Sequence, residues 1–458
     1  MSDQPNIILI NCDDLGYGDL GCYGSGINQT PYLDQMAADG IQFTDFYMGS
    51  PVCSPSRGAM LTGCYPPRIG FAEFDGRWVL FPGQSLGLNP SEKTVASLLK
   101  EVGYATKIVG KWHCGDQKEF LPTRHGFDSY YGIPYSNDMG RQTPDDKYPP
   151  LPLLFDEDVI QEQPDQASVT ERYVEESVRF IRANQDTPFF LYFAHMYVHL
   201  PIYPPDRFMR ESENGRYGAA VQAIDWSVGV LLDELKQLGL DENTLVIFTS
   251  DNGSRARGEG GSNKPLRGTK GTTWEGGQRV PCIMRWPSQI PPGSVSNQLV
   301  SAIDLCPTLV ELAGGEMPSD RIIDGKDISS LIRNEEGAIT PRETFLYYRL
   351  HNLMAIRSGR WKLHTHTVGK SGIEVCNELY DLVADIGETT NLYDQHPDIV
   401  ADLNAQMDIY RKDLGDNLTG TKGENTRSVG RVDSSDTLTH YDPDHPYIIA
   451  MYDLKDRG

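Results

Sequence analysis

A short run that begins at Cys53 combines residue types that could attack and hold an anion. It places a thiol at Cys53, a proline at Pro55 and a guanidinium at Arg57. Pro55 suits the first turn of a helix, whose free N–H groups would face the space beside Cys53 and favour an anion there. The fork of Arg57 suits a tetrahedral oxyanion. The run predicts a nucleophile beside an anion site, although a lone cysteine is more often an ordinary buried thiol.

Acidic and amide side chains follow two apolar runs. Asp13 and Asp14 come directly after one run, and Asp251 and Asn252 come directly after another. Each pair on its own also fits a solvated turn, since Asp and Asn are turn formers. Together they would supply only oxygen ligands, which suit a hard cation such as Ca²⁺ or Mg²⁺. A metal site is favoured because three clustered carboxylates would repel one another without a cation.

Basic side chains follow further apolar runs. Lys111 and His113 share one face of an extended segment, where they could neutralise an anion and exchange a proton. The spacing of His195 and His199 would bind zinc on a helix, but the segment is strand-like and then a loop, so we discount zinc. Lys270 lies in a glycine-rich loop that could cradle an anion.

Strand-like runs alternate with helical patterns over the first three hundred residues. Buried strands that alternate with helices predict an α/β fold, a large mostly parallel sheet sandwiched by helices. In such sheets ligands lie beyond the carboxyl ends of the strands, where the residues above begin. The expected strands are 6–11, 105–110, 189–196, 244–250 and 281–286, and the expected helices are 94–102, 171–185 and 219–238.

The pattern of expected secondary structure changes near residue 340. Short antiparallel strands are expected over 343–364, with a helix near 397–413 packed on them. We therefore predict a catalytic α/β domain over 1–340 and a smaller C-terminal α+β subdomain over 341–458, with a short antiparallel sheet plus a helix. Two polar stretches are expected outside regular structure. They are a surface excursion over 139–168 and a polar loop over 415–445, which either crosses the main domain or is poorly ordered.

Composition excludes several classes of protein. The 458 residues carry 64 acidic and 41 basic side chains, a formal charge of −23, which disfavours a nucleic-acid partner. No apolar run approaches the length of a membrane span, so no membrane partner is expected. The eight cysteines form no CxxC pair and predict neither a disulfide framework nor a structural zinc site. Because the start of the chain lacks a signal peptide, we expect either a cytoplasmic protein or a periplasmic or secreted one whose leader is absent.

The residues from Cys53 to Gly63 match the pattern C-x-P-S-R-x-x-x-L-T-G at every fixed position. This pattern resembles the signature of the formylglycine-dependent sulfatases, in the alkaline phosphatase-like superfamily. The likeness is closest to the branch of arylsulfatase A and N-acetylgalactosamine-6-sulfatase and extends over nearly the whole chain. Further segments that carry it are Asp13-Asp14, 123–128, 132–138, 275–281 and 378–382.

The resemblance implies hydrolysis of aryl or carbohydrate sulfate monoesters to an alcohol and sulfate. A maturation enzyme would oxidise Cys53 to formylglycine, whose hydrate attacks sulfur and forms a sulfo-enzyme intermediate. Calcium, with magnesium as the alternative, would be the metal. The implied metal ligands are Asp13, Asp14, Cys53, Asp251 and Asn252. The implied catalytic residues are Cys53, Arg57, Lys111, His113, His199 and Lys270, and the implied substrate contacts are Lys111, Ser136, His199 and Lys270.

Two other interpretations of the same residues stay open at this stage. One is a phosphate or phosphonate monoester hydrolase of the same superfamily, since cross-reactivity between the two kinds of ester is plausible. The other is a catalytically silent relative that binds calcium or a glycan, which would hold if Cys53 were never oxidised. A pure binder has no need of both His113 and Lys270, which favours an enzyme. Cys114 is the one departure from the family pattern, where many relatives have leucine.

Overall fold

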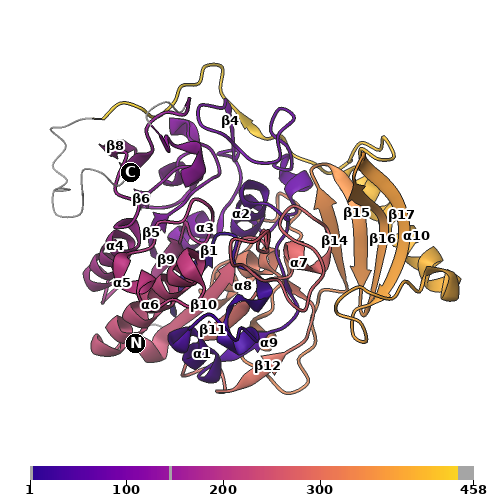
Figure 1. Ribbon diagram of the computed structural model, residues 1–458, viewed down its shortest axis with the longest axis horizontal. Coiled ribbons are helices and arrows are strands. Elements are labelled where there is room, and N and C mark those ends of the chain that lie inside the picture. The colour runs from indigo at the N-terminus through magenta and orange to yellow at the C-terminus, as the bar shows by residue number, and fades with distance from the viewer. Residues whose placement is uncertain (1–3, 144–146, 442–458) are drawn as a thin grey trace.

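A twisted ten-stranded sheet forms the centre of the computed structural model, which describes residues 4–143 and 147–441 (Figure 1). Its five middle strands are parallel, and the strands next to them on both sides pair in antiparallel fashion. In spatial order the strands are β12 (Ser294–Ser296), β2 (Ile41–Phe43), β11 (Cys282–Arg285), β10 (Thr244–Ser250), β1 (Asn6–Cys12), β9 (Phe189–Ala194), β5 (Ala105–Gly110), β6 (Ser129–Gly132), β7 (Pro152–Phe155) and β8 (Asp158–Glu162).

Helices cover both faces of this sheet, so its strands are apolar on both sides. Along β1, Ile7 and Leu9 join one hydrophobic core, whereas Ile8 and Ile10 join the other. This alternation follows from the strand repeat of two residues. Helices α1 (Pro31–Ala38), α4 (Val169–Ala183) and α6 (Gly215–Gln237) pack on one face, and α2 (Cys53–Thr62), α3 (Val95–Glu101) and α8 (Leu305–Leu312) pack on the other.

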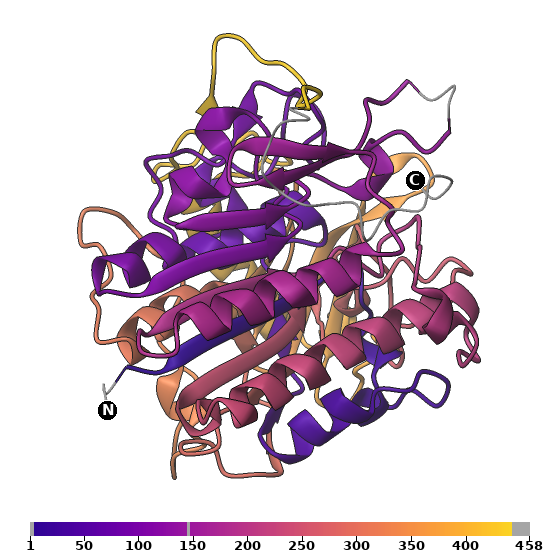
Figure 2. The same cartoon turned by 90° about the vertical axis from the view of Figure 1, so that its left-hand side faces the viewer.

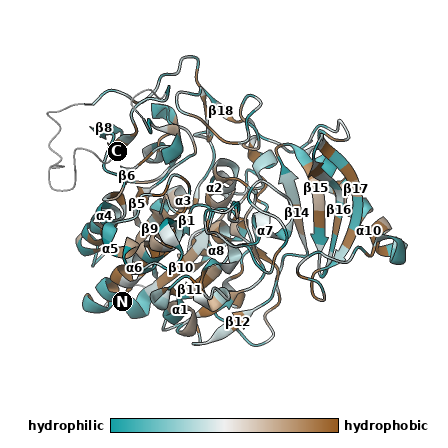
Figure 3. Cartoon of the chain, viewed as in Figure 1, coloured by the Kyte–Doolittle hydropathy of each residue, from teal (hydrophilic) through white to brown (hydrophobic). Residues whose placement is uncertain are grey.

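The outer helices are amphipathic. Figure 2 shows α4 and α6 lying side by side across the sheet, and the two helices are in contact. Figure 3 shows hydrophilic residues on the outward side of α4, while Tyr173, Val174 and Ile181 of that helix are buried in the core. The prediction of a mostly parallel sheet between helices is therefore confirmed.

A separate four-stranded antiparallel sheet lies at one side of the molecule (Figure 1). It consists of β14 (Thr344–Arg349), β15 (Asn352–Ser358), β16 (Trp361–Gly369) and β17 (Gly372–Asp381), with α10 (Pro397–Leu414) packed on it. A third hydrophobic core joins this sheet to the main one, since Phe345 and Leu346 pack with Tyr47 and Ile303. The small antiparallel sheet and its helix are as the sequence predicts, and the division at residue 340 stays a prediction.

Short elements complete the fold. The remaining helices are α5 (Asp206–Met209), α7 (Glu275–Gln278) and α9 (Ser329–Ile332). The remaining strands form two small pairs, β3 (Phe46–Tyr47) with β13 (Val300–Ser301) and β4 (Leu86–Gly87) with β18 (Gly430–Arg431). Among the described residues no helix is both long and apolar enough to span a bilayer.

Two stretches expected to be irregular are partly ordered. The predicted excursion over 139–168 contains β7 and β8, because Leu151, Leu153 and Leu154 are buried against the edge of the sheet. The predicted polar loop over 415–445 returns to the main domain and forms β18. Its last residues, 442–445, lie outside the described part of the chain.

Candidate active site

The parallel middle strands end at one edge of the sheet, and each delivers polar residues there. Parallel strands have their carboxyl ends together, so residues distant in sequence converge at that edge. Asp13 and Asp14 follow β1, Lys111 and His113 follow β5, Ser136 comes four residues after β6, His199 comes five residues after β9, and Asp251 and Asn252 follow β10. Gly110 allows this convergence, since a Cβ atom there would lie 1.9 Å from the carbonyl oxygen of Ala194.

Helix α2 begins at Cys53 and brings Arg57 into the same place, one turn further on. Arg57 is fully buried, and all three of its nitrogens donate hydrogen bonds. Nε donates to Asp251 Oδ2 at 2.8 Å, Nη2 to Asp13 Oδ2 at 3.0 Å and Nη1 to the carbonyl oxygen of Lys111 at 2.8 Å. The guanidinium therefore fixes the spacing of two carboxylates behind the thiol.

Two lysines flank the thiol of Cys53. Lys270 Nζ lies 3.3 Å from Cys53 Sγ and 2.7 Å from Asp14 Oδ1. Lys111 Nζ contacts Asp13 Oδ2 and lies 3.2 Å from Ser136 Oγ. Cys53 Sγ itself lies 3.5 Å from Asp13 Oδ1. The thiol thus lies among two carboxylates and three cations, of which Arg57 and Lys111 are buried and Lys270 is partly exposed.

Each of two histidines has one ring nitrogen fixed by a backbone carbonyl. His113 Nε2 lies 3.0 Å from the carbonyl oxygen of Leu80, which can only accept, so the ring donates there. His113 Nδ1 has no hydrogen-bond partner. His199 Nδ1 lies 2.6 Å from the carbonyl oxygen of Leu200, and its Nε2 lies 3.8 Å from Asp14 Oδ2. The nitrogen that each ring leaves available to the site is therefore Nδ1 in His113 and Nε2 in His199.

Local backbone strain accompanies these side chains. Asp14 and His113 have φ angles of 61° and 60°, in the left-handed region that non-glycine residues seldom occupy. Such conformations persist where the surroundings determine them, and they cluster at functional sites. In this protein Asp14 lies two residues after the end of β1, and His113 lies three residues after the end of β5.

Burial and neighbouring charges shift the pKa values of the carboxyl groups in opposite directions. Burial raises the pKa of Asp251 to about 6, and the charge of Asp13 adds to this. Burial would also raise the pKa of Asp13, but Lys111, His199 and Arg57 hold it well below its usual range. Burial, followed by the charge of Lys111, lowers the pKa of His113 well below that of a free histidine. His113 is therefore neutral near pH 7, as a base must be.

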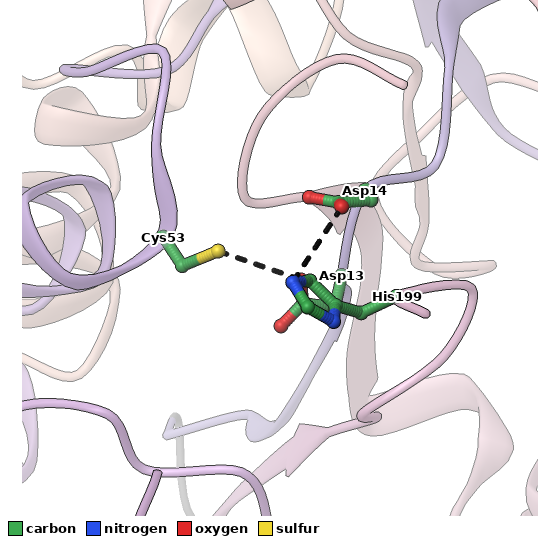
Figure 4. Close-up of side chains that lie close together, drawn as sticks. All are labelled: Asp13, Asp14, Cys53 and His199. Atoms are coloured by element: carbon green, nitrogen blue, oxygen red, sulfur yellow. Dashed lines mark hydrogen bonds and ion pairs between the residues drawn. The ribbon is translucent and has the colours of Figure 1, made fainter. Parts of the chain in front are cut away.

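The acidic residues form a cluster that could hold a metal ion. Ligand atoms of Asp13, Asp14, Cys53 and His199 all lie within 4.8 Å of one another (Figure 4). Asn252 donates through Nδ2 to Asp14 at 2.8 Å, while its buried Oδ1 has no partner. An amide oxygen left unpaired beside carboxylates fits a hard cation. Asp251 accepts from Arg57 Nε at 2.8 Å through Oδ2 and from the backbone N–H of Asp14 at 3.3 Å through Oδ1, and His199 adds a nitrogen to the cluster.

A cavity of about 260 Å³ opens beside the thiol. Five residues singled out from the sequence line it: Cys53, His113, Ser136, His199 and Lys270. The sequence analysis missed Arg255, Arg257 and Asp138 as lining residues. The available signal was that these charged residues lie within six positions of Asp251 or Ser136 in the sequence. Trp78 lines it too.

Other polar candidates lie away from the cavity. His195 is buried at the end of β9 and lies 3.1 Å from Thr170 Oγ1, so it does not join His199 in a zinc site. Cys114 is buried in the hydrophobic core. These two side chains are structural.

Comparison with known proteins places this geometry in a family. The sequence model of the family described as sulfatase matches residues 5–315, and that of the N-sulphoglucosamine sulphohydrolase C-terminal region matches residues 269–413. N-acetylgalactosamine-6-sulfatase of Rattus norvegicus is 43% identical over 393 residues, covering 81% of this chain and 74% of that protein. Arylsulfatase A of Homo sapiens is 39% identical over 429 residues, covering 85% and 83%.

A solved sulfatase structure has a similar fold. The crystal structure of a sulfatase from Pseudoalteromonas sp. superimposes with a TM-score of 0.82 at 28% identity, covering 93% of this chain and 92% of that one. The family match spans most of the chain, and it includes the cysteine, the buried cations and the acidic cluster around the cavity. The chain therefore belongs to the sulfatase family, the enzymes that hydrolyse sulfate esters.

Proposed function

We propose that the protein hydrolyses the sulfate monoester of a carbohydrate or a small aryl alcohol, and that Cys53 is the precursor of its nucleophile. The observation that carries this proposal is the position of the Cys53 thiol at the cavity, with Lys270 Nζ 3.3 Å away and Arg57 and Lys111 buried behind it. Oxidation of Cys53 to formylglycine would supply a hydrated aldehyde, with one hydroxyl to attack sulfur and a second to release sulfate by elimination.

The three cations would counter the charge of the sulfate oxygens as the transition state forms. Arg57, Lys111 and Lys270 are held by Asp251, Asp13 and Asp14, so they need no reorganisation during the reaction. Burial would lower the pKa of Lys270, but Asp14 raises it well above its usual value. Asp13 likewise raises the pKa of Lys111 against the effect of burial. Both lysines therefore stay charged when an anionic ester enters.

The histidines would move protons at two places. His113 lines the cavity beside Cys53 and keeps Nδ1 free, so we assign it the proton of a hydroxyl at position 53. His199 lies on the other side, against Ser136 at 3.3 Å, and we assign it with Lys270 to the oxygen of the leaving alcohol. Asp251, which Arg57 holds, would help to deprotonate the attacking hydroxyl.

Asp13, Asp14 and Asn252 would hold a calcium ion, with position 53 and Asp251 completing its ligands. The unpaired Oδ1 of Asn252 and the carboxylates of Asp13 and Asp14 support calcium, with magnesium as the alternative. When bound, the ion would polarise a sulfate oxygen and neutralise the carboxylates.

Two measurements on one preparation test the proposal. Peptide mass spectrometry across residues 53–63 reports whether Cys53 has been oxidised, which we expect after co-expression with a formylglycine-generating enzyme. The oxidised protein should then hydrolyse 4-nitrophenyl sulfate over many turnovers and prefer it to 4-nitrophenyl phosphate at equal concentration. A Cys376→Ser variant, altered on β17 away from the cavity, serves as the matched control.

Each outcome separates one part of the proposal from the rest. Oxidised protein that hydrolyses neither ester contradicts the function, whereas preference for the phosphate ester establishes the other superfamily reaction. Turnover by protein that retains an unmodified thiol contradicts the role of formylglycine and leaves sulfate hydrolysis in place.

A further inference from the structure

We propose that the cavity contains a second anion site, formed by Arg255 and Arg257, and that the substrate is a sulfated glycan with another anionic group on the adjoining sugar. This inference rests on the proposed function, because it extends the same cavity. The second group is a carboxylate or a second sulfate. Arginine suits either, since its planar fork donates two parallel hydrogen bonds to an oxyanion.

The first support is the isolation of the two positive charges. Arg255 and Arg257 line the cavity together with Cys53 and Lys270. Among the residues that the structure describes, neither guanidinium has an ion pair. The chain has 64 acidic side chains against 41 basic ones, and many of its arginines pair with an acid, whereas these two guanidiniums keep their charge available at the cavity. The carboxylate of Glu259 accepts from the backbone N–H of Arg257 at 2.8 Å and not from its guanidinium, so the guanidinium can bind a ligand.

The second support is that the loop which carries them is anchored to the catalytic centre. Asn263 Oδ1 accepts from the backbone N–H of Ser254 at 2.8 Å, and its Nδ2 donates to the carbonyl oxygen of Ser254 at 2.8 Å. The same carbonyl accepts from the backbone N–H of Lys270 at 3.0 Å. Arg255 therefore directly follows Ser254, a buried residue whose backbone hydrogen bonds also position Lys270. Its place relative to the sulfate site is fixed at the base of the loop.

The third support concerns the kind of molecule that would carry both anions. Trp78 is 43% exposed at the cavity, an aromatic surface of the kind on which a sugar ring can pack. Arg349 stabilises it, with its guanidinium 4.9 Å from the ring centroid, while donating to the carbonyl oxygen of Gly271 at 3.2 Å. Asp138 also lines the cavity. A carboxylate would repel an anion but accepts hydrogen bonds from sugar hydroxyls, which a small aryl sulfate lacks.

The size of the cavity agrees with a ligand larger than one sulfate group. At about 260 Å³ it approaches the lower end of ligand pockets, roughly 300 Å³. The polar and aromatic residues are divided between two regions: Cys53, His113 and His199 belong to the catalytic centre, while Arg255 and Arg257 belong to the neighbouring loop. One sugar at the first region would place its neighbour at the second.

Competitive inhibition tests the second site without requiring that the ligand be hydrolysed. The reporter is turnover of 4-nitrophenyl sulfate by the matured protein. The inhibitors are a chondroitin disaccharide with one 6-sulfate and a uronate carboxylate, the carboxyl methyl ester of the same disaccharide, and a form that carries a second sulfate on the ester. The protein variants are the wild type, Arg255→Gln/Arg257→Gln, and the matched control Lys236→Gln/Lys412→Gln, whose lysines are exposed and do not line the cavity.

We expect the free acid or the disulfated form to inhibit the wild type at about tenfold lower concentration than the singly charged ester. The ratio should fall to nearly one in the double arginine variant and persist in the lysine control. It should also shrink as salt rises, because the screening length is only about 10 Å at 0.1 M. Whichever disaccharide shows the effect identifies the second group as carboxylate or sulfate.

The outcomes that overturn the second site differ from those that overturn the function. Equal inhibition by all three disaccharides, absence of inhibition by any, or a ratio that survives in the arginine variant contradicts the second anion site while reporter turnover continues. Matured wild-type protein that does not hydrolyse the reporter contradicts the proposed function itself.

Discussion

Two buried clusters in this molecule contain the same charges but are built differently. The site cluster consists of Asp13, Asp14, Asp251, Arg57, Lys111 and Lys270. The small-sheet cluster consists of Asp45, Glu275, Glu388, Arg279, Arg357 and Lys362. Each has three carboxylates and three cations, and every member is buried except Lys270, whose side chain is 16% exposed. Charge count and burial alone therefore do not distinguish a reactive site from a structural one.

The small-sheet cluster is closed, because its charged groups are paired with one another. Lys362, on β16, lies 2.9 Å from Glu275 and 2.8 Å from Glu388, and it donates to the carbonyl oxygen of Thr273 at 2.9 Å. The hydroxyls of Tyr47 and Tyr347 donate to the two oxygens of Glu275. Although burial would raise the pKa of Glu275, the cations around it, Lys362 first, lower it well below the usual value. Every charge here is matched, and the cluster joins the small sheet to the main domain.

The site cluster is open. It adjoins a cavity, and the neighbouring Asn252 Oδ1 and His113 Nδ1 have no partners. Burial raises the pKa of Asp251 to about 6, the opposite direction from Glu275. Opposed shifts and unpaired polar atoms are what a site retains when a substrate or a metal must complete it. Substitutions in the two clusters should therefore affect different properties.

The largest effect is expected at Cys53. Cys53→Ala removes the precursor of the nucleophile and should lower kcat for 4-nitrophenyl sulfate by about 10,000-fold or more, since both steps of covalent catalysis are lost. Because the thiol has no strong hydrogen bond, the unfolding temperature should change by only a few degrees. Turnover and thermal unfolding measured together check this, with Cys376→Ser as the control. A large loss of stability would place Cys53 with the structural residues.

Lys362→Met should show the opposite pattern. Removing the shared cation leaves Glu275 and Glu388 buried without their main partner, which costs about 3–5 kcal/mol in the free energy of unfolding. We expect kcat to fall by less than tenfold in the protein that stays folded. Urea unfolding measures the loss.

Lys370→Met, an exposed lysine at the end of the same sheet, is the matched control for Lys362 and should change stability by less than about 0.5 kcal/mol. A stable Lys362→Met protein that has lost turnover would contradict the distinction between the clusters, since it would assign Lys362 to the chemistry.

Lys270→Met tests the same removal of a buried cation in the open cluster. The side chain of Lys270 is 16% exposed at the cavity, so water there can hydrate Asp14 after the substitution. We expect kcat to fall about 100- to 1,000-fold, the usual result of removing one group that stabilises transition-state charge. The unfolding free energy should change by less than about 1 kcal/mol. A loss as large as that of Lys362→Met would show that both clusters are equally structural.

The sequence predicts the site cluster because each member lies next to a recognisable feature. Asp13, Lys111 and Asp251 follow apolar strands, and parallel strands bring such residues together without knowledge of the packing. Arg57 and Cys53 belong to one short pattern on one helix. The central strands and the helices on both faces are predictable for the same reason, since their periodicity is local in sequence.

The small-sheet cluster could not be predicted in this way. Asp45, Glu275, Arg357 and Glu388 come from separate segments, and their meeting depends on how the small sheet docks. Strand β17 was also missed, because residues 372–377 are mostly exposed and carry little apolar periodicity. Arg255 and Arg257 lie on a loop, where side-chain direction follows from local turns and not from a repeat.

Calcium should produce the smallest effect and should act on one cluster only. An ion that binds the folded site at 100 times its Kd stabilises the protein by about 2.7 kcal/mol, so added calcium should raise the unfolding temperature of the wild type. Asp14→Asn, which keeps the shape of the side chain, should reduce this rise, whereas Asp398→Asn on the exposed side of α10 should not. The rise should be undiminished in Lys362→Met, because sites without shared partners contribute additively. A calcium effect that disappears with Lys362 would mean that the two clusters are coupled, and an absent effect in the wild type would contradict calcium as the metal.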